Sequence, residues 1–145
     1  MEAHATYDDV NLLLRLYELR REQKMRTARD WFARNFKAAT LEEFNTVCPQ
    51  GSEEHAYFRM VLSYWEMVAS FITSGVLNQE LFFQSGGELL FVWERFRTYL
   101  PQAREQYKNP GVYKNLETVA QAFIQWMNKN SPGAYQAFSA RVGGS

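Results

Sequence analysis

Apolar side chains recur every three or four residues along most of the chain, which is the spacing of one face of an α-helix. The pattern first runs through residues 7–38, a segment without proline or glycine. Its apolar stripe consists of Val10, Leu14, Tyr17, Met25, Ala28, Phe32 and Phe36. Thr6 suits the N-cap position, and Asp8 and Asp9 suit the positive end of the helix dipole. We therefore predict one long N-terminal helix, about 45 Å in length, which overhangs, bends or meets another chain.

Start and stop signals divide the next part of the chain into further helices. Thr40 followed by Glu43 has the spacing of a capping box, in which each side chain satisfies a backbone donor near the other residue. This pair predicts a short helix over residues 41–47. Ser52 can cap a second long helix, and Gly75 is the expected stop because glycine suits the left-handed conformation after a helix end.

Glycine and proline set the remaining boundaries. Gly86 and Gly87 interrupt the next apolar pattern at a cost of about 1 kcal/mol each relative to alanine, so we expect a kink or a close helix approach there. Pro101 can open a further turn or two as an early helical residue. The last two helices are predicted over residues 112–128 and 132–141.

These helices define the predicted fold class, because we find no strand-like alternation of useful length. The chain is expected to be all-α, a helical bundle of four principal helices plus short accessory helices. Residues 1–142 form one predicted domain, and residues 143–145 are set aside as a flexible tail or a cloning remnant. A chain of 145 residues is long enough to bury a single core without disulfide or metal support.

Composition narrows the chemistry that the fold can carry. A single cysteine, Cys48, excludes an internal disulfide, and two histidines are too few for an ordinary structural zinc site. The longest apolar run, residues 89–93, is far shorter than the roughly 18–20 residues that cross a bilayer. The first residues also lack the pattern of a secretion signal. We therefore expect no metal, no cofactor and no membrane span, and a cytoplasmic location.

Enzyme motifs are absent from the sequence. It contains no Gly-rich phosphate loop, HExxH helix, CxxC pair or GxSxG elbow. Cys48 and His55 form the only thiol and imidazole pair close in sequence, but Pro49, Gly51 and a predicted helix start lie between them. A nucleophilic cysteine needs a nearby base and an orienting third group. We therefore interpret Cys48 and His55 as incidental, assign no catalytic residue, and favour a non-enzyme.

Charge is balanced over the whole chain but uneven along it. Residues 10–38 carry eight basic and three acidic side chains, whereas residues 39–100 carry three basic and eight acidic ones. Clustered basic residues attract polyanions through counterion release. A nucleic-acid site of this kind would use a basic face formed by Arg15, Arg20, Lys24, Arg29 and Lys37. The competing interpretation is that helix i,i+4 pairing and packing against acidic helices neutralise this charge, so nucleic-acid binding is the weaker hypothesis.

Arg21 is the candidate for a buried charge, because on a continuous helix it falls inside the apolar stripe. A buried arginine requires a partner. Glu66 and Glu94 each directly follow a tryptophan at a predicted core position. We therefore expect an ion pair between Arg21 and Glu66 or Glu94. The alternative role for Arg21 is a ligand-binding charge in a pocket.

Two functions from different classes remain. The favoured one is a non-enzymatic interaction module that presents its long first helix and its aromatic surface to itself, as a homodimer, or to another protein. Two adjacent aromatic pairs, Trp31-Phe32 and Phe82-Phe83, support an aromatic surface because both members cannot face inward on a narrow stripe. The alternative is a small-molecule sensor or enzyme with a pocket between helices near Gly86-Gly87. Its expected walls are Trp65, Glu66, Trp93 and Glu94.

Several motifs resemble those of a known family. They are Tyr64-Trp65-Glu66, Ser74-Gly75-Val76-Leu77, Glu80-Leu81-Phe82-Phe83, Gly86-Gly87 and Val92-Trp93-Glu94. In this order they resemble a bacterial family of uncharacterised helical proteins, the domain of unknown function 4760, over roughly residues 41–122. The resemblance implies a helical fold and no known activity. Members often carry N-terminal membrane helices, whereas this sequence begins with a charged helix.

Overall fold

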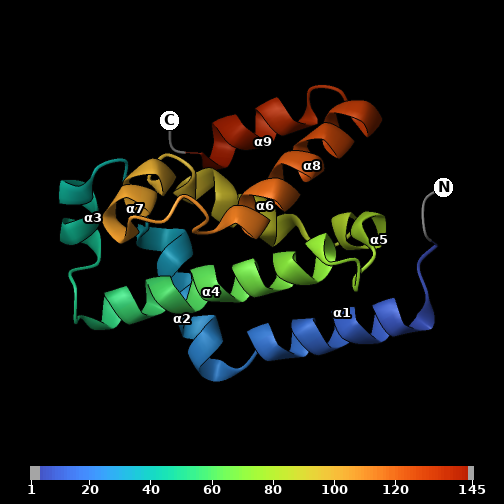
Figure 1. Cartoon of the computed structure of the whole chain (residues 1–145), viewed down its shortest axis with the longest axis horizontal. Coiled ribbons are helices and arrows are strands. Elements are labelled where there is room, and N and C mark those ends of the chain that lie inside the picture. The colour runs from blue at the N-terminus through green and yellow to red at the C-terminus, as the bar shows by residue number, and fades with distance from the viewer. Residues whose placement is uncertain (1–3, 144–145) are drawn as a thin grey trace.

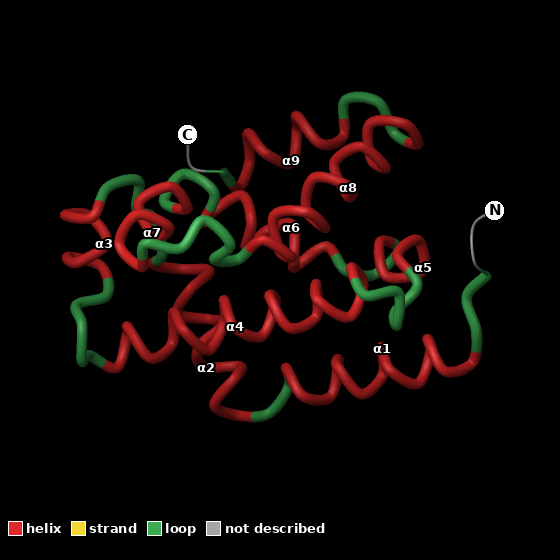
Figure 2. Tube along the Cα trace, viewed as in Figure 1, coloured by secondary structure: helices red, strands yellow, loops and turns green. Residues whose placement is uncertain are grey.

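The computed structural model describes residues 4–143, and all regular structure within that range is helical (Figure 1; Figure 2). The helices are α1 (Tyr7–Arg20), α2 (Gln23–Asn35), α3 (Leu41–Val47), α4 (Glu53–Thr73), α5 (Gln79–Phe83), α6 (Gly87–Phe96), α7 (Leu100–Tyr107), α8 (Lys114–Asn130) and α9 (Ala134–Val142). The all-α prediction is therefore confirmed. The count of four principal helices is not confirmed. The helices of the described residues range from short to long, and no group of four stands apart from the others.

The predicted long N-terminal helix is divided in two, since the chain breaks at Arg21–Glu22. Of the expected alternatives, a bend is the one that occurs. Glu22 has an extended backbone and caps α2, its carboxylate accepting a hydrogen bond from the backbone N–H of Met25 at 3.2 Å. Arg29 Nη1 donates to the carbonyl oxygen of Arg20 at 2.8 Å, which satisfies an acceptor at the end of α1. The two helices consequently run in different directions, and α1 lies beside α4 (Figure 1).

The core is organised around α4, the longest helix of the described chain, which packs against α2 and α8. Its buried side chains are Phe58, Val61, Leu62, Tyr64, Trp65, Val68, Ala69 and Ile72. α8 also contacts α6 and α9, so the C-terminal helices form a second layer over the central one (Figure 1). Of the four tryptophans, Trp65 and Trp93 are buried, while Trp31 and Trp126 are partly buried at the edge of the core.

Several local signals after residue 39 are confirmed, whereas α8 and α9 each begin two residues later than predicted, at Lys114 and Ala134. Thr40 and Glu43 form the predicted capping box of α3, and Ser52 caps α4. Gly75 follows the end of α4 with φ of 81°, a left-handed value that favours glycine. Gly86 is a point of close approach, since a Cβ atom there would lie 2.5 Å from the ring of Phe82.

The C-terminal boundary differs from the prediction. Gly143 caps α9, and its N–H donates to the carbonyl oxygen of Ser139 at 2.7 Å. Gly143 is also buried, so it belongs to the folded domain. The rest of the predicted tail, residues 144–145, lies outside the described residues.

The end of α9 is joined to the end of α2 by one side chain. Arg95 of α6 donates from Nε to the carbonyl oxygen of Val142 at 2.6 Å. Its Nη1 donates to the carbonyl oxygens of Phe36 at 3.1 Å and Ala33 at 3.3 Å. Helix C-termini carry unpaired carbonyl groups and partial negative charge, so one guanidinium satisfies acceptors from two helices.

Across residues 4–143, no helix combines the length and the apolar character needed to cross a bilayer.

Candidate functional site

The outward surface of α1 is unusually apolar. Within this helix only Asp9 and Leu16 are buried. Its exposed large apolar side chains are Tyr7 at 77%, Val10 at 41%, Leu14 at 55%, Tyr17 at 46% and Leu19 at 43% of their accessible surface. Four of them, Tyr7, Val10, Leu14 and Tyr17, follow the three-and-four spacing of a helix-packing seam. We call these four residues the outer stripe.

The outer stripe corrects a sequence interpretation. Val10, Leu14 and Tyr17 were expected to continue the core stripe formed by the buried Met25, Ala28 and Phe32. The break before α2 changes the direction of the helix, so the two halves of the predicted stripe do not face the same neighbours. The residues are the predicted ones, but in α1 they form surface rather than core.

Hydrogen bonds fix the inner side of α1 against the rest of the protein. The Tyr64 hydroxyl donates to the carbonyl oxygen of Leu16 at 2.5 Å. Burial raises the pKa of Tyr64 to about 12, so the hydroxyl keeps its proton at neutral pH. Asp9, in the first turn, accepts a hydrogen bond from the N–H of Asn78. The outer stripe is therefore presented on a helix whose orientation is set at both ends.

An apolar groove of about 430 Å³ runs beside the outer stripe. One wall is α1, with Val10, Leu14 and Tyr17 at its edge. The other wall comes from α4, α5 and the following turn, and includes Trp65, Val68, Leu81, Phe82 and Gly86. A cavity between helices was predicted near Gly86 with Trp65 on its wall, and the structure has one. The other predicted wall residues, Glu66, Trp93 and Glu94, do not line it.

Arg20, Arg29 and Glu88 form a charge cluster at the end of this groove. Arg29 donates from Nε and Nη2 to the two carboxylate oxygens of Glu88, both at 2.7 Å. The hydrogen bond to Glu88 is the largest cause of the raised pKa of Arg29. The Arg20 guanidinium lies 5.0 Å from the ring centroid of Tyr17 and 5.5 Å from that of Trp65, and its Nη1 is 3.9 Å from Glu88.

The predicted Arg21 ion pair is wrong. Arg21 is exposed, and its guanidinium lies 5.3 Å from the ring centroid of Tyr17. Within the described chain it pairs with neither Glu66 nor Glu94. The reason is the break at this residue: Arg21 is the C-cap of α1, so its position on a continuous helical wheel does not apply. The arginine that turns inward is Arg20.

Glu66 and Glu94 join helices through other donors. Glu66 accepts from the side chain of Asn115 and the backbone N–H of Leu116, both at 2.8 Å, which holds the start of α8 against α4. Glu94 is 3% exposed. It accepts from the hydroxyls of Tyr135 and Ser139, both at 2.6 Å, and from Arg97 at 3.3 Å. Both carboxylates are structural acceptors between helices.

The predicted continuous basic face is not formed. Arg20 and Arg29 turn toward Glu88, as described above. Arg15, Lys24 and Lys37 are exposed, but they lie on α1, on α2 and after the end of α2 respectively. The break between the first two helices separates these three cations.

The aromatic pairs behave differently from each other. Phe82 and Phe83 are both buried, at 3% and 4% exposure, so the expectation that one would face solvent is wrong. The reason is that α5 is a short helix covered on two sides: Phe82 lines the groove beside α1, while Phe83 packs against Phe123 of α8 at 4.5 Å between ring centroids. Trp31 is partly buried beside the buried Phe32.

Among residues 4–143, no group of three or more His, Cys, Asp or Glu side chains could hold a metal ion. Cys48 is fully buried, and burial raises the pKa of its thiol to about 12. Because the thiolate is the reactive form, Cys48 is inert as a nucleophile at neutral pH.

The fold and this surface define an all-α protein built on a long central helix, with an apolar stripe exposed along its first helix. Residues 5–140 match the profile of the domain of unknown function DUF4760. The chain therefore belongs to this family. No curated protein and no solved structure matches the chain.

Proposed function

We propose that the protein is a non-enzymatic helical interaction module that self-associates through α1. The observation that carries the proposal is the exposure of the outer stripe, from 41% at Val10 to 77% at Tyr7. Apolar residues at a/d spacing bury themselves against a second helix when one is present. A contiguous exposed apolar surface on a folded protein is characteristic of an interaction site.

The spacing of the stripe suits a second copy of α1 in antiparallel orientation. Val10 and Leu14 lie symmetrically about Leu12, and so do Tyr7 and Tyr17. A two-fold axis at Leu12 therefore places Val10 of one copy against Leu14 of the other. The same axis places Tyr7 against Tyr17, so one stripe is complementary to itself, as a two-fold interface requires.

Charge along α1 supports the same orientation. The exposed Asp8 lies near the start of the helix, and the exposed Arg15 lies in its second half. In the antiparallel arrangement Asp8 lies within one residue of the level of Arg15 of the second copy, about 1.5 Å along the axis, whereas a parallel arrangement brings like charges together. Antiparallel packing also sets the positive end of each helix dipole beside the negative end of the other.

Light scattering over a range of protein concentrations tests the proposal. We expect a mass of twice the 17.0 kDa monomer for the natural sequence and the monomer mass for Leu14→Glu, since a charge would be buried in the interface. Leu19→Glu is the matched control, because Leu19 is 43% exposed on the same helix but lies off the stripe, and this variant should stay dimeric. A natural protein that is monomeric at high concentration, or a dimeric Leu14→Glu, would refute self-association through α1.

Cysteine cross-linking tests the orientation. Mixing Tyr7→Cys with Tyr17→Cys should give a disulfide-linked heterodimer, while Tyr7→Cys alone should cross-link poorly because its two copies lie about 15 Å apart along antiparallel helices. Cys48 does not interfere, since it is fully buried. Efficient cross-linking of Tyr7→Cys with itself would indicate a parallel pair instead.

The groove beside α1 supports a second candidate, a small-molecule sensor. Its volume of about 430 Å³ is within the usual range for ligand pockets. Two features favour the interaction module over it. The Arg20 guanidinium already lies over the Trp65 ring, and the groove shares Val10, Leu14 and Tyr17 with the stripe that a second α1 would cover.

A further inference from the structure

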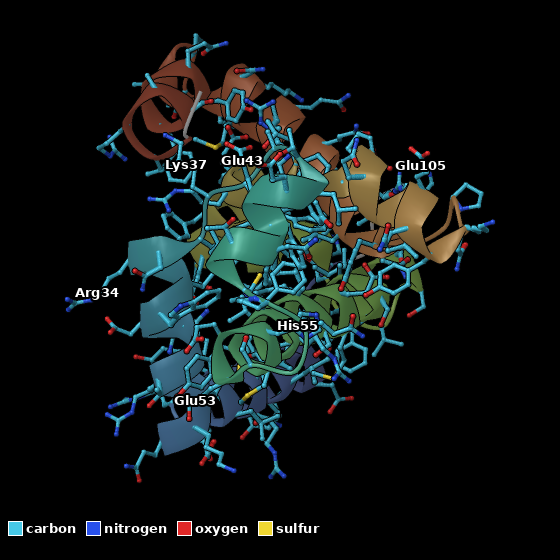
Figure 3. All side chains as sticks on the ribbon, turned by 90° about the vertical axis from the view of Figure 1, so that its left-hand side faces the viewer. Arg34, Lys37, Glu43, Glu53, His55 and Glu105 are labelled. Atoms are coloured by element: carbon cyan, nitrogen blue, oxygen red, sulfur yellow. The ribbon has the colours of Figure 1, made fainter. Side chains whose placement is uncertain are left out.

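A smaller cavity lies at the end of the molecule formed by α3, the start of α4 and α7 (Figure 3). In Figure 1 this end is on the left, away from the start of α1. The cavity has a volume of about 140 Å³, room for roughly four or five water molecules at about 30 Å³ each. Its aromatic lining consists of Phe44, Phe58, Tyr99, Tyr107, Tyr113 and His55.

The polar groups of the lining are neutral amides and phenols together with the imidazole of His55. The amides belong to Asn45, Gln50 and Gln106, and no Asp, Glu, Lys or Arg is among the lining residues. Tyr99 is 3% exposed, and its ring stacks on that of Phe44 with 4.4 Å between centroids. The amides and phenols of the lining offer hydrogen-bond donors and acceptors to a bound ligand.

Tyr99, Tyr107 and Tyr113 lie near enough for their phenol groups to affect one another's pKa values. Burial is the main cause of the raised pKa of Tyr99 and of Tyr113, and Tyr107 raises the pKa of both. Tyr113 has a left-handed backbone, with φ of 57°, a conformation that is costly for a bulky residue and is often retained at ligand sites. The surrounding fold therefore holds Tyr113 in this backbone conformation at the wall of the cavity.

One segment beside the cavity is acidic. Residues 38–58, which include α3 and the first turn of α4, contain four glutamates and no lysine or arginine. Figure 3 shows His55 in the middle of this end of the molecule, with Glu43, Glu53 and Glu105 around it. Basic groups also surround the cavity: Arg59 acts on Tyr113, and Arg104 is paired with Glu117 at 2.9 Å. Lys37 acts on Glu43 and lies beside it in Figure 3. Lys108 and Lys114 directly follow Tyr107 and Tyr113.

We propose that this cavity binds a small organic cation, an ammonium group of about the size of choline. Aromatic faces carry negative electrostatic potential and attract quaternary ammonium groups, and the lining has no charged side chain that would compete for such a ligand. Tyr107 is 60% exposed and makes no ring contact with another aromatic residue of the described chain, so its face is available. The phenol and amide oxygens of the lining can accept hydrogen bonds from the polar part of the ligand.

The test is titration of the intact protein with choline, followed by NMR chemical shifts. 3,3-Dimethylbutan-1-ol is the control ligand, because it has the same shape without the charge. We expect saturable choline binding and at least about tenfold weaker binding of the neutral alcohol. Equal binding of both ligands, stronger binding of acetate, or no saturable shifts with choline near about 10 mM would overturn the proposal.

Variants locate the binding. Tyr107→Ala should weaken choline binding about tenfold, whereas Tyr107→Phe should retain it because the ring remains. Tyr7→Ala is the matched control, since Tyr7 is exposed at the other end of the molecule, and it should leave binding unchanged. The Tyr107 variants should keep the natural thermal unfolding temperature, as the side chain is largely outside the core.

The cavity is remote from α1, so the monomeric Leu14→Glu protein should bind choline normally. This keeps the outcome separate from the self-association test. An equal loss in Tyr7→Ala, or no loss in Tyr107→Ala, would show that the cavity is not the site.

Discussion

Asp9 and Asn78 are joined across 69 positions of the chain, the Asp9 carboxylate accepting a hydrogen bond from the Asn78 backbone N–H at 2.8 Å. The other carboxylate oxygen of Asp9 accepts from the backbone N–H of Thr6 at 2.7 Å. One side chain thus caps α1 and attaches it to Asn78, the N-cap residue of α5. These two backbone donors are the main causes that hold the pKa of Asp9 below its usual range, with Thr6 the larger.

Asp9→Asn should destabilise the protein more at neutral pH than in acid. Because the pKa of Asp9 is lower in the folded state than in the unfolded state, its contribution to stability is fully present above the ordinary value of 3.8 and declines progressively as the pH falls from there through the lower folded-state pKa. Urea denaturation of both proteins at pH 7 and pH 3 measures this. A difference in unfolding free energy that is the same at both pH values would contradict the assignment.

Glu88→Gln should cost about 1–3 kcal/mol of unfolding free energy, because it leaves the guanidinium of Arg29 partly buried without its charged, two-oxygen acceptor. The side chains of Arg29 and Glu88 are both 25% exposed. The matched control is Asp30→Asn, which removes the exposed Arg34–Asp30 pair and should change stability by less than about 0.5 kcal/mol. Equal effects of the two substitutions, measured by chemical denaturation, would show that the Glu88 cluster is not stabilising.

Gly86→Ala and Gly87→Ala should differ sharply although the residues are adjacent. A Cβ atom at Gly86 would lie 2.5 Å from the Phe82 ring and 2.8 Å from its carbonyl oxygen, so the turn between α5 and α6 must shift. We expect a loss of about 1–3 kcal/mol. At Gly87 the same atom meets nothing within 4 Å, so that variant should be neutral or slightly more stable in thermal unfolding. A neutral Gly86→Ala would show that the turn is looser than the structure indicates.

Short-range chemistry explains which parts of the fold the sequence could predict. The Thr40–Glu43 capping box and the left-handed Gly75 depend on interactions within a few residues, so their sequence spacing was sufficient to place α3 and the end of α4. The all-α class follows in the same way from the periodicity of apolar residues.

The break after α1 depends on residues far away in sequence, which is why periodicity missed it. Neither proline nor glycine occurs there. The carbonyl of Arg20 is satisfied by Arg29, and Arg29 is itself held by Glu88, which lies 59 positions further on. A helical wheel drawn through the break then places Arg21 inside and its neighbour Arg20 outside, the reverse of what the structure shows.

The outer stripe and the aromatic cavity also differ in how far the sequence could reveal them. The residues of the outer stripe were visible in the sequence as a periodic set, but only the structure shows that Val10, Leu14 and Tyr17 stay uncovered. The aromatic cavity had no sequence signal beyond His55, because its walls combine α3, α4, α7 and the segment before α8. Residues from four separate segments cannot be grouped without knowing how the chain returns on itself.

The three hydrogen bonds of Arg95 couple the end of α2 to the end of α9. Its guanidinium bonds the carbonyl of Phe36, just after α2, and that of Val142, at the end of α9, so a movement of the Arg95 side chain releases both acceptors together. Segments near residues 36 and 142 should therefore open as one cooperative unit in native-state hydrogen exchange, although more than a hundred residues of chain separate them.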